Sequence, residues 1–160
     1  IAFLTEIDHE EFLSLKQETE ADPGKRTAQK RLAAWMTQFV HSDEGLAAAN
    51  QASEILFGGE IDRLTDRDLT EIFADVPSCD LSRESLRGEG LWIVDAVRQA
   101  GLATSSGEAR RAIQEGGVYV NNRRVGEIDR KLSEADLASE TVMVLRKGKR
   151  NYALLRFSVQ

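Results

Sequence analysis

The chain has 160 residues, 41% of them hydrophobic and 30% charged, with only 2 Pro, which indicates one ordinary or two small folded domains and excludes a disordered chain. No apolar run approaches the roughly 20 residues that cross a bilayer, and the amino end IAFLTEIDHEEF lacks the basic region and apolar core of a signal peptide. The formal charge of −6 conceals an asymmetry, because residues 1–90 carry a net charge of −10 and residues 91–160 a net charge of +4. Only the second half is therefore expected to meet a polyanion.

Cysteine and histidine are too sparse for a disulfide or a metal site. Cys79 is the sole cysteine, so no internal disulfide can form, which predicts a cytoplasmic protein. His9 and His41 are far apart in the sequence, and no metal ligand set is recognisable. Nucleotide-binding, zinc-protease and hydrolase motifs are missing from the sequence, so neither a catalytic residue nor a cofactor is expected in this chain. Because it begins with Ile1 and not Met, the chain is expected to be processed or a fragment.

The first half of the chain is predicted to be helical. Asp8 is placed to cap a helix that runs to about Glu20, and the residues Asp22–Gly24 then break it. A second helix is predicted over about Arg26–His41. It carries an apolar stripe at helical spacing, expected to face a core, made of Ala28, Leu32, Trp35, Met36, Phe39 and Val40.

Two further helices complete the predicted first domain. The third is expected to stop at Gly58-Gly59, because glycine accepts the left-handed conformation that ends helices. The fourth is short and begins at a capping box of Thr65 with Asp68. Short-looped helices of this kind form a small bundle, which we expect over residues 1–76. Residues 77–90 lose the helical periodicity and are predicted to be an interdomain linker.

The second half, residues 91–160, is predicted to mix helices with strands, so the fold class is α+β. One helix is expected over Leu91–Ala100. Another is expected over Ser105–Glu115, begun by a capping box of Ser105 with Glu108 and stopped by two glycines. The remaining predicted elements are a strand at Val118–Val120, a tight turn at Asn121-Asn122, and a last pair of strands at Thr141–Leu145 and Tyr152–Val159.

Basic residues gather at two places in this second half. On the helix Ser105–Glu115, Arg110 and Arg111 project from the face opposite the apolar side chains. The backbone N–H groups at Ser105 and Ser106 are expected to form an anion site. The following strand and turn bring Arg123 and Arg124 nearby. This combination favours RNA binding, although arginines on a short helix can equally well only be solvated.

The second basic cluster is the stretch RKGKR, at the expected tip of the last hairpin. Four cations in five residues repel one another unless a polyanion or an acidic partner relieves the repulsion. The cluster therefore favours a phosphate-binding role over a merely solvated turn. Its four members are Arg146, Lys147, Lys149 and Arg150.

These residues resemble a known family. The segment SSGEARRAIQEGGVYVNNRRV resembles the core of the alpha-L RNA-binding domain, which occurs in a ribosomal protein, in pseudouridine synthases and in bacterial tyrosyl-tRNA synthetases. The segments Asp22–Gly59 and Arg146–Phe157 are similar to the helical region and the final hairpin of bacterial tyrosyl-tRNA synthetases. The resemblance therefore covers nearly the whole chain, in the order of that family.

The resemblance implies a helical anticodon-arm-binding domain over residues 1–76 and an alpha-L domain over residues 91–160. It implies that the whole enzyme, a class I aminoacyl-tRNA synthetase, uses ATP and Mg to charge tyrosine tRNA. It further implies that these two domains hold the anticodon arm and the long variable arm. The family's catalytic domain, with its HIGH-like and KMSKS-like motifs, has no counterpart here, so this chain alone is expected to be inactive. Because the family dimerises through that domain, the chain is expected to be monomeric.

Within the first domain, a basic cluster stands out against acidic surroundings. It is expected either to contact the anticodon stem or to cap helix ends and pair with the preceding acidic helix. Its members are Lys25, Arg26, Lys30 and Arg31. The acidic helix around Asp8–Glu11 could instead read anticodon bases, since carboxylates accept hydrogen bonds from base amino groups.

Other functions compete with this interpretation. A free-standing RNA-binding protein of ribosome assembly or rescue would use the same alpha-L module, but it has no reason to carry a segment like Asp22–Gly59. A fragment of a pseudouridine synthase would place a catalytic domain after the module. A protein–protein adaptor would account for residues 1–85 but not for the basic hairpin.

Overall fold

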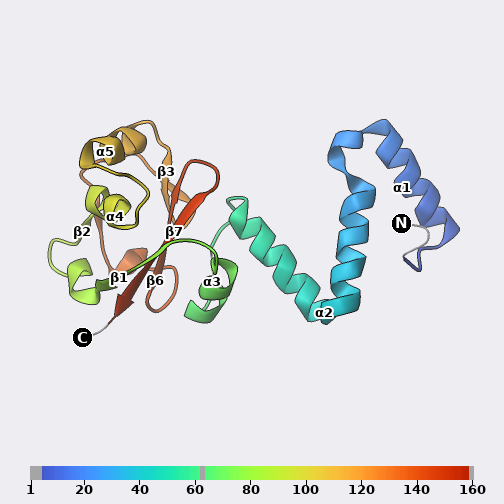
Figure 1. Cartoon of the computed structure of the whole chain (residues 1–160), viewed down its shortest axis with the longest axis horizontal. Coiled ribbons are helices and arrows are strands. Elements are labelled where there is room, and N and C mark those ends of the chain that lie inside the picture. The colour runs from blue at the N-terminus through green and yellow to red at the C-terminus, as the bar shows by residue number, and fades with distance from the viewer. Residues whose placement is uncertain (1–4, 62–63, 159–160) are drawn as a thin grey trace. The chain divides into compact units, whose positions relative to one another are not determined.

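The computed structural model describes residues 5–61 and 64–158, and Figure 1 shows its helices and strands in chain order. The chain forms two compact units that divide between Gln51 and Ala52. The long helix α2 (Thr27–Leu56) contributes to both of them, and each unit is described separately below.

The first unit consists of α1 (His9–Ala21), the 3-10 turn η1 (Pro23–Lys25) and the first part of α2. As predicted, Asp8 caps α1, its Oδ1 accepting a hydrogen bond of 2.7 Å from the Glu11 backbone N–H. Ser42 has non-helical angles (φ 69°, ψ 179°) inside α2. The two helices predicted before and after this residue are therefore both present, joined at Ser42.

The apolar stripe predicted to face a core is only half covered. Leu32 and Trp35 are partly buried, but Phe39 is 74% exposed and Val40 62% exposed. The physical reason is that the described residues of this unit supply only α1 as a covering helix, and α1 buries a single residue, Leu15. The Phe39 ring stacks on the Trp35 ring at a centroid distance of 5.1 Å.

The second unit is built on a sheet with the strand order β1-β7-β6-β3-β4. β1 runs parallel to β7, and the other neighbouring strands are antiparallel. A separate pair, β2 with β5, is antiparallel. The strands of the unit are β1 (Ser78–Ser82), β2 (Leu91–Trp92), β3 (Val118–Val120), β4 (Arg123–Val125), β5 (Lys131–Leu132), β6 (Val142–Lys147) and β7 (Asn151–Ser158). Its helices are α3 (Asp66–Ile72), α4 (Ile93–Gln99), α5 (Ser106–Gln114) and the 3-10 turns η2 (Arg83–Leu86) and η3 (Glu134–Asp136).

Helices cover both faces of the sheet, which confirms the α+β class (Figure 1). Because strand side chains alternate between faces, Ala153, Leu155 and Phe157 of β7 pack in one core with α4 and α5. Tyr152 and Leu154 pack in a second core with α3 and the end of α2. The two basic elements, α5 and the β6–β7 hairpin, are thus held on a rigid scaffold.

The structure corrects two predicted boundaries: the helical domain does not extend to residue 76, and residues 77–90 are not a linker. Residues 78–82 form an edge strand of the sheet and not part of a linker. The capping box of Thr65 with Asp68 begins α3 as predicted. However, Leu69 of α3 and its C-cap Phe73 are buried on the sheet, so α3 belongs to the second unit. The reason is that the second face of the sheet needs an apolar cover, and a seven-residue helix beside the strands supplies it.

Along the described residues, no helix combines the length and the apolar character that crossing a membrane requires. In the same ranges, no group of three or more His, Cys, Asp or Glu residues is arranged to hold a metal ion.

Candidate nucleic-acid interface

The amino end of α5 is built as predicted, with one change. Ser105 caps the helix, and its Oγ accepts from the Glu108 backbone N–H at 3.2 Å. The Glu108 carboxylate does not return to Ser105, as a capping box would require, but accepts from the N–H and the hydroxyl of Thr104, each at 2.8 Å. Its other oxygen pairs with Lys147 Nζ, and this hydrogen bond is the main reason that the pKa of Glu108 falls to about 2.

This arrangement changes the expected role of three predicted residues. Lys147 also donates to the Leu102 carbonyl at 2.9 Å, so its ammonium group is already occupied by the protein. The ionised Glu108 carboxylate lies over the first turn of α5, where Ser105 and Ser106 were expected to offer an anion site. A phosphate there would have this carboxylate, which is paired with Lys147, as its neighbour, and the anion site at Ser105 and Ser106 stays a prediction.

The arginines of α5 lie on its exposed face, as predicted. Ala109 and Ile113 are fully buried beneath them. The Arg110 guanidinium carbon lies 5.1 Å from the centre of the Trp92 ring, and Lys131 Nζ lies 5.9 Å from the same centre. The ring thus holds two cations by cation–π attraction, which leaves the N–H groups of the guanidinium available for phosphate. The Arg111 side chain makes no hydrogen bond or ion pair with another described residue.

Arg123 and Arg124 are neighbours in β4 but differ in their surroundings. Arg124 donates to the Gly116 carbonyl at 2.9 Å and to the Glu115 carbonyl at 3.3 Å, which caps the carboxyl end of α5. Gly116 has φ +68°, a conformation that other residues rarely adopt, and a Cβ at this position would lie 1.7 Å from the guanidinium, so Arg124 would have to move. Arg124 is therefore structural. Arg123 is exposed and has no side-chain partner among the described residues.

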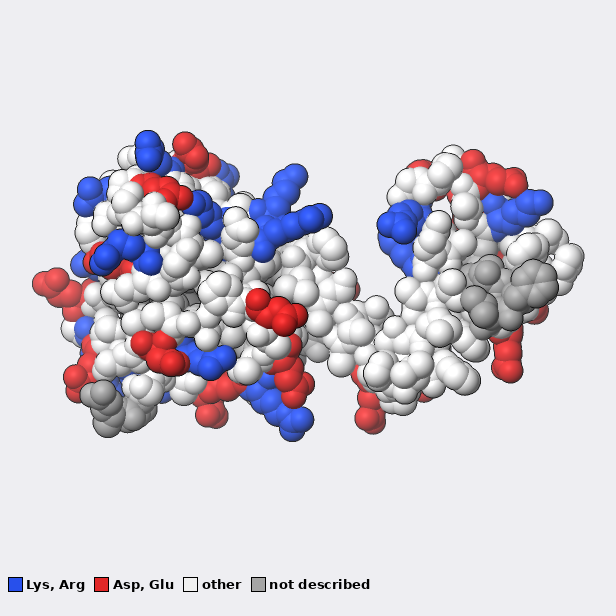
Figure 2. All heavy atoms as spheres, in the orientation of Figure 1, with Lys and Arg blue, Asp and Glu red and all other residues white. Residues whose placement is uncertain are grey.

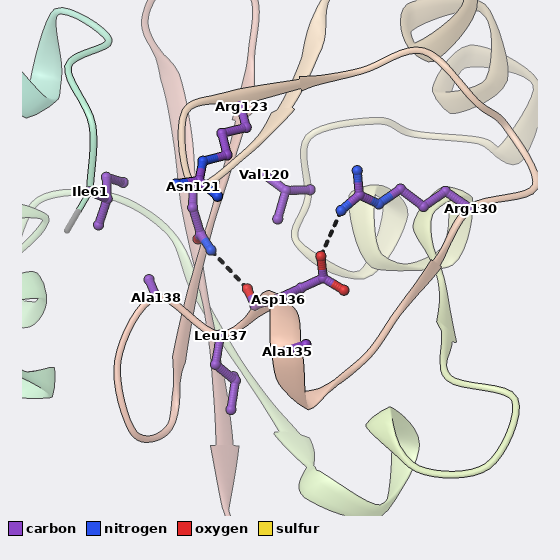
Figure 3. Close-up of a pocket in the computed structure, with 9 residues that line it drawn as sticks. All are labelled: Ile61, Val120, Asn121, Arg123, Arg130, Ala135, Asp136, Leu137 and Ala138. Atoms are coloured by element: carbon purple, nitrogen blue, oxygen red, sulfur yellow. Dashed lines mark hydrogen bonds and ion pairs between the residues drawn. The ribbon is translucent and has the colours of Figure 1, made fainter. Parts of the chain in front are cut away.

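Arg123 stands at the rim of a polar pocket of about 200 Å³ (Figure 3). Inside the pocket, Arg130 donates to the Asp136 carboxylate at 2.6 Å, and the Asn121 amide donates to the Asp136 carbonyl at 2.7 Å. These polar groups satisfy one another. The pocket therefore offers few free donors to a ligand, apart from Arg123 itself.

The tip of the β6–β7 hairpin carries the other basic cluster. Lys149 and Arg150 are exposed, and their side chains have no partner among the described residues. The Arg146 guanidinium lies 3.7 Å from the centre of the Tyr119 ring and donates from Nε to Asn122 Oδ1 at 3.0 Å. Figure 2 shows basic side chains gathered over α5 and over this hairpin. Two of the four predicted cations are thus available to phosphate, and contacts with Tyr119 and Asn122 hold Arg146 beside them.

An exposed aromatic side chain that was not predicted to be a site residue lies beside these cations. Phe57 follows the last residue of α2, and its side chain is 86% exposed. It lines a hollow of about 320 Å³ together with Leu56, Arg146, Lys149 and Arg150. We call these five residues the hairpin surface. An exposed ring among cations is the combination that proteins use to stack an unpaired base and hold its phosphate.

The basic cluster of the first unit is partly committed to the protein. Arg31 pairs with Glu11 at 2.5 Å, which is the salt bridge that the structural alternative predicted. Lys25 lies 4.0 Å from the Asp22 carboxylate with both side chains exposed, a weak interaction. Arg26 has φ +53° and caps η1 through its backbone N–H, and the side chains of Arg26 and Lys30 are exposed. Lys25, Arg26 and Lys30 thus stay as candidate contacts.

The alternative that the acidic helix reads bases loses most of its hydrogen-bond acceptors, because the protein already uses them. Asp8 is used as the cap of α1, and Glu11 is held by Arg31. Of the acidic residues at the start of this helix, Glu10 alone has no such partner among the described residues.

The sequence and the fold both resemble those of known proteins. The family model described as the tyrosine–tRNA ligase SYY-like C-terminal domain matches residues 68–155. The chain belongs to this family. It is 55% identical over 156 residues to a tyrosine–tRNA ligase of Rhodopirellula baltica and 42% identical over 156 residues to one of Roseiflexus castenholzii. Each alignment covers 98% of this chain, but only 36% and 37% of these relatives.

A solved structure supports the same assignment. The solution structure of a tyrosyl-tRNA synthetase C-terminal domain matches 62% of this chain and 96% of its own length, at 33% identity and a TM-score of 0.50. The resemblance inferred from the sequence is therefore confirmed. The family match includes α5 and the β6–β7 hairpin, whereas Phe57 and the basic cluster of the first unit lie before it.

Proposed function

We propose that this chain is the tRNA-binding part of a tyrosine–tRNA ligase, a class I aminoacyl-tRNA synthetase. In this proposal it holds tyrosine tRNA by the anticodon arm and the long variable arm, while a catalytic domain outside this chain performs the ATP- and Mg-dependent charging. The chain itself is then inactive in tyrosine activation. Because the family's dimer forms through the catalytic domain, the chain alone is monomeric.

The observation that carries this proposal is the hairpin surface. Lys149 and Arg150, which have no partner among the described residues, lie beside the Phe57 ring, which is almost fully exposed. Like charges that have no acidic partner repel each other, and a polyanion removes that cost. The exposed arginines Arg110, Arg111 and Arg123 add further positive charge on α5 and β4. Phosphates of one RNA can therefore be held at several points at once.

The proposal predicts that the chain discriminates between tRNAs. We expect tighter binding to tyrosine tRNA than to a tRNA with a short variable arm, because the second lacks one of the two arms that the chain holds. Fluorescence anisotropy with end-labelled tRNAs in matched buffers measures this difference. Equal affinities for the two tRNAs would contradict the family-specific function and favour a general RNA-binding protein.

A further inference from the structure

The turn between β3 and β4 fastens the end of α2 to the sheet. The Asn122 amide donates to the Ile55 carbonyl at 2.8 Å and to the Gly59 carbonyl at 2.9 Å. The Tyr152 hydroxyl lies 3.2 Å from the Leu56 carbonyl and 3.3 Å from that of Ile55. The last carbonyls of a helix have no partners within it, so these side chains act as its cap. The cap comes from a part of the sequence more than sixty residues away.

Phe57 lies inside this capped turn. Its own N–H donates to the Ser53 carbonyl at 3.0 Å, and the Gly59 N–H donates to the Glu54 carbonyl at 2.8 Å, with Gly58 at φ +97° between them. The residues on both sides of Phe57 are therefore tied to the sheet, through the carbonyls of Leu56 and Gly59. Because 86% of Phe57 is exposed, little packing holds the ring, and its place depends mainly on this backbone turn.

The same amide also touches the basic side of the hairpin surface. Asn122 Oδ1 accepts from Arg146 Nε at 3.0 Å and lies 3.3 Å from the Tyr152 hydroxyl. One amide group thus connects the turn that carries Phe57 with the strand that carries Arg146. Asparagine suits this position because it tolerates φ +62° and offers donors and an acceptor together.

We propose that Asn122 is a positioning residue that fixes the Phe57 ring beside the hairpin cations, so that a base and its phosphate are bound together. This inference rests on the proposed function, and it gives Asn122 a role beyond forming the turn. Its neighbour Asn121 provides a matched comparison. Asn121 also has a positive φ, of 48°, and uses its amide group twice, donating to the Asp136 carbonyl and accepting from the Val144 N–H. Neither of these bonds reaches α2.

The test is a double-mutant cycle on tyrosine tRNA affinity with Asn122→Gly and Phe57→Ala, and with Asn121→Gly as the control. Glycine keeps the positive φ and removes only the side chain. We expect Asn122→Gly to weaken binding at least about fivefold in the wild-type background and less than about twofold in the Phe57→Ala background. Asn121→Gly should change affinity less than about twofold in both backgrounds. Circular dichroism should show that all variants are folded.

Other outcomes overturn the inference. If Asn122→Gly leaves the tRNA affinity unchanged, Asn122 does not act through Phe57. The same conclusion follows if the double variant loses affinity by the product of the two single-variant factors. If Asn122→Gly does not fold, Asn122→Asp replaces it, because aspartate keeps the acceptor for Arg146 and lacks the donors for the two carbonyls. If the wild-type chain binds no tRNA, the proposed function fails together with this inference. If the wild-type chain binds tRNA but the two substitutions reduce affinity independently, this inference fails and the proposed function stands.

Discussion

Replacing Phe57 with Ala is expected to weaken tRNA binding about 5- to 150-fold, because stacking of one base on an aromatic side chain contributes roughly 1–3 kcal/mol. The free energy of unfolding should change by less than about 0.5 kcal/mol, since an exposed ring contributes little to the core. Titration of labelled tyrosine tRNA and denaturant unfolding of the same samples measure the two effects separately.

The choice of side chain at this position separates stacking from simple apolar contact. Phe57→Trp keeps a flat ring and should bind within a few-fold of wild type, whereas Phe57→Leu keeps the apolar volume and should bind nearly as weakly as Phe57→Ala. If Leu restored binding as well as Trp, the ring would be an apolar contact and not a stacking platform. If Ala bound as tightly as wild type, Phe57 would have no place in the interface.

Replacing Phe73 with Ala should destabilise the second unit by about 3–5 kcal/mol, the usual cost of removing a fully buried aromatic ring. Phe73 is 1% exposed and lies between α3 and the sheet, where its ring centre is 5.1 Å from that of Tyr152. The chain has two tryptophans, so a Trp35→Phe background leaves Trp92 as a reporter of the second unit alone. Urea unfolding followed by Trp92 fluorescence measures the loss.

The same experiment distinguishes the observed place of α3, on the sheet, from the predicted one, in a helical bundle. If α3 belonged to a helical bundle with α1, removal of the Phe73 ring would leave the Trp92 transition unchanged. Leu13→Ala is the control, because Leu13 is 49% exposed and belongs to the first unit. It should leave the Trp92 transition in place.

Elements defined by local chemistry were predictable from the sequence. The Ser105 cap and the glycine stop of α5 act within a few residues of the helix, and both are found. The turn at Asn121-Asn122 is also set locally, because asparagine tolerates the two positive φ angles that a two-residue hairpin needs. Local patterns therefore located the basic helix and the basic hairpin correctly.

Elements defined by distant partners were not predictable. β1 alternates polar and apolar residues, and Cys79 and Leu81 pack against a core, but the pattern spans only five residues and the strand pairs with β7, more than seventy residues later. Pro77 before it and the glycines after it are typical of a linker, and they outweighed this short pattern. The placement of α3 on the sheet likewise depends on an apolar face that is assembled from remote strands.

The sequence predicted where the candidate site lies, but not which of its side chains are available to RNA. A run of cations in the sequence does not reveal that Lys147 is paired with Glu108 or that Arg124 caps a helix. Phe57 sits directly before Gly58-Gly59, where the sequence indicated only the end of a helix. An aromatic residue beyond the last buried position of the helix was the available signal.

The salt dependence of binding tests most directly whether the free cations of the hairpin surface hold phosphates of the tRNA. The wild-type chain should show a log–log slope of roughly −3 to −5, and Lys149→Ala with Arg150→Ala should reduce its magnitude by roughly 1.4 to 1.8, the contribution of two phosphate contacts. Arg67→Ala with Arg87→Ala removes the same charge from residues that are ion-paired with Glu71 and Glu134, and should leave the slope unchanged. A slope that is the same for the wild type and the hairpin variant would contradict the account.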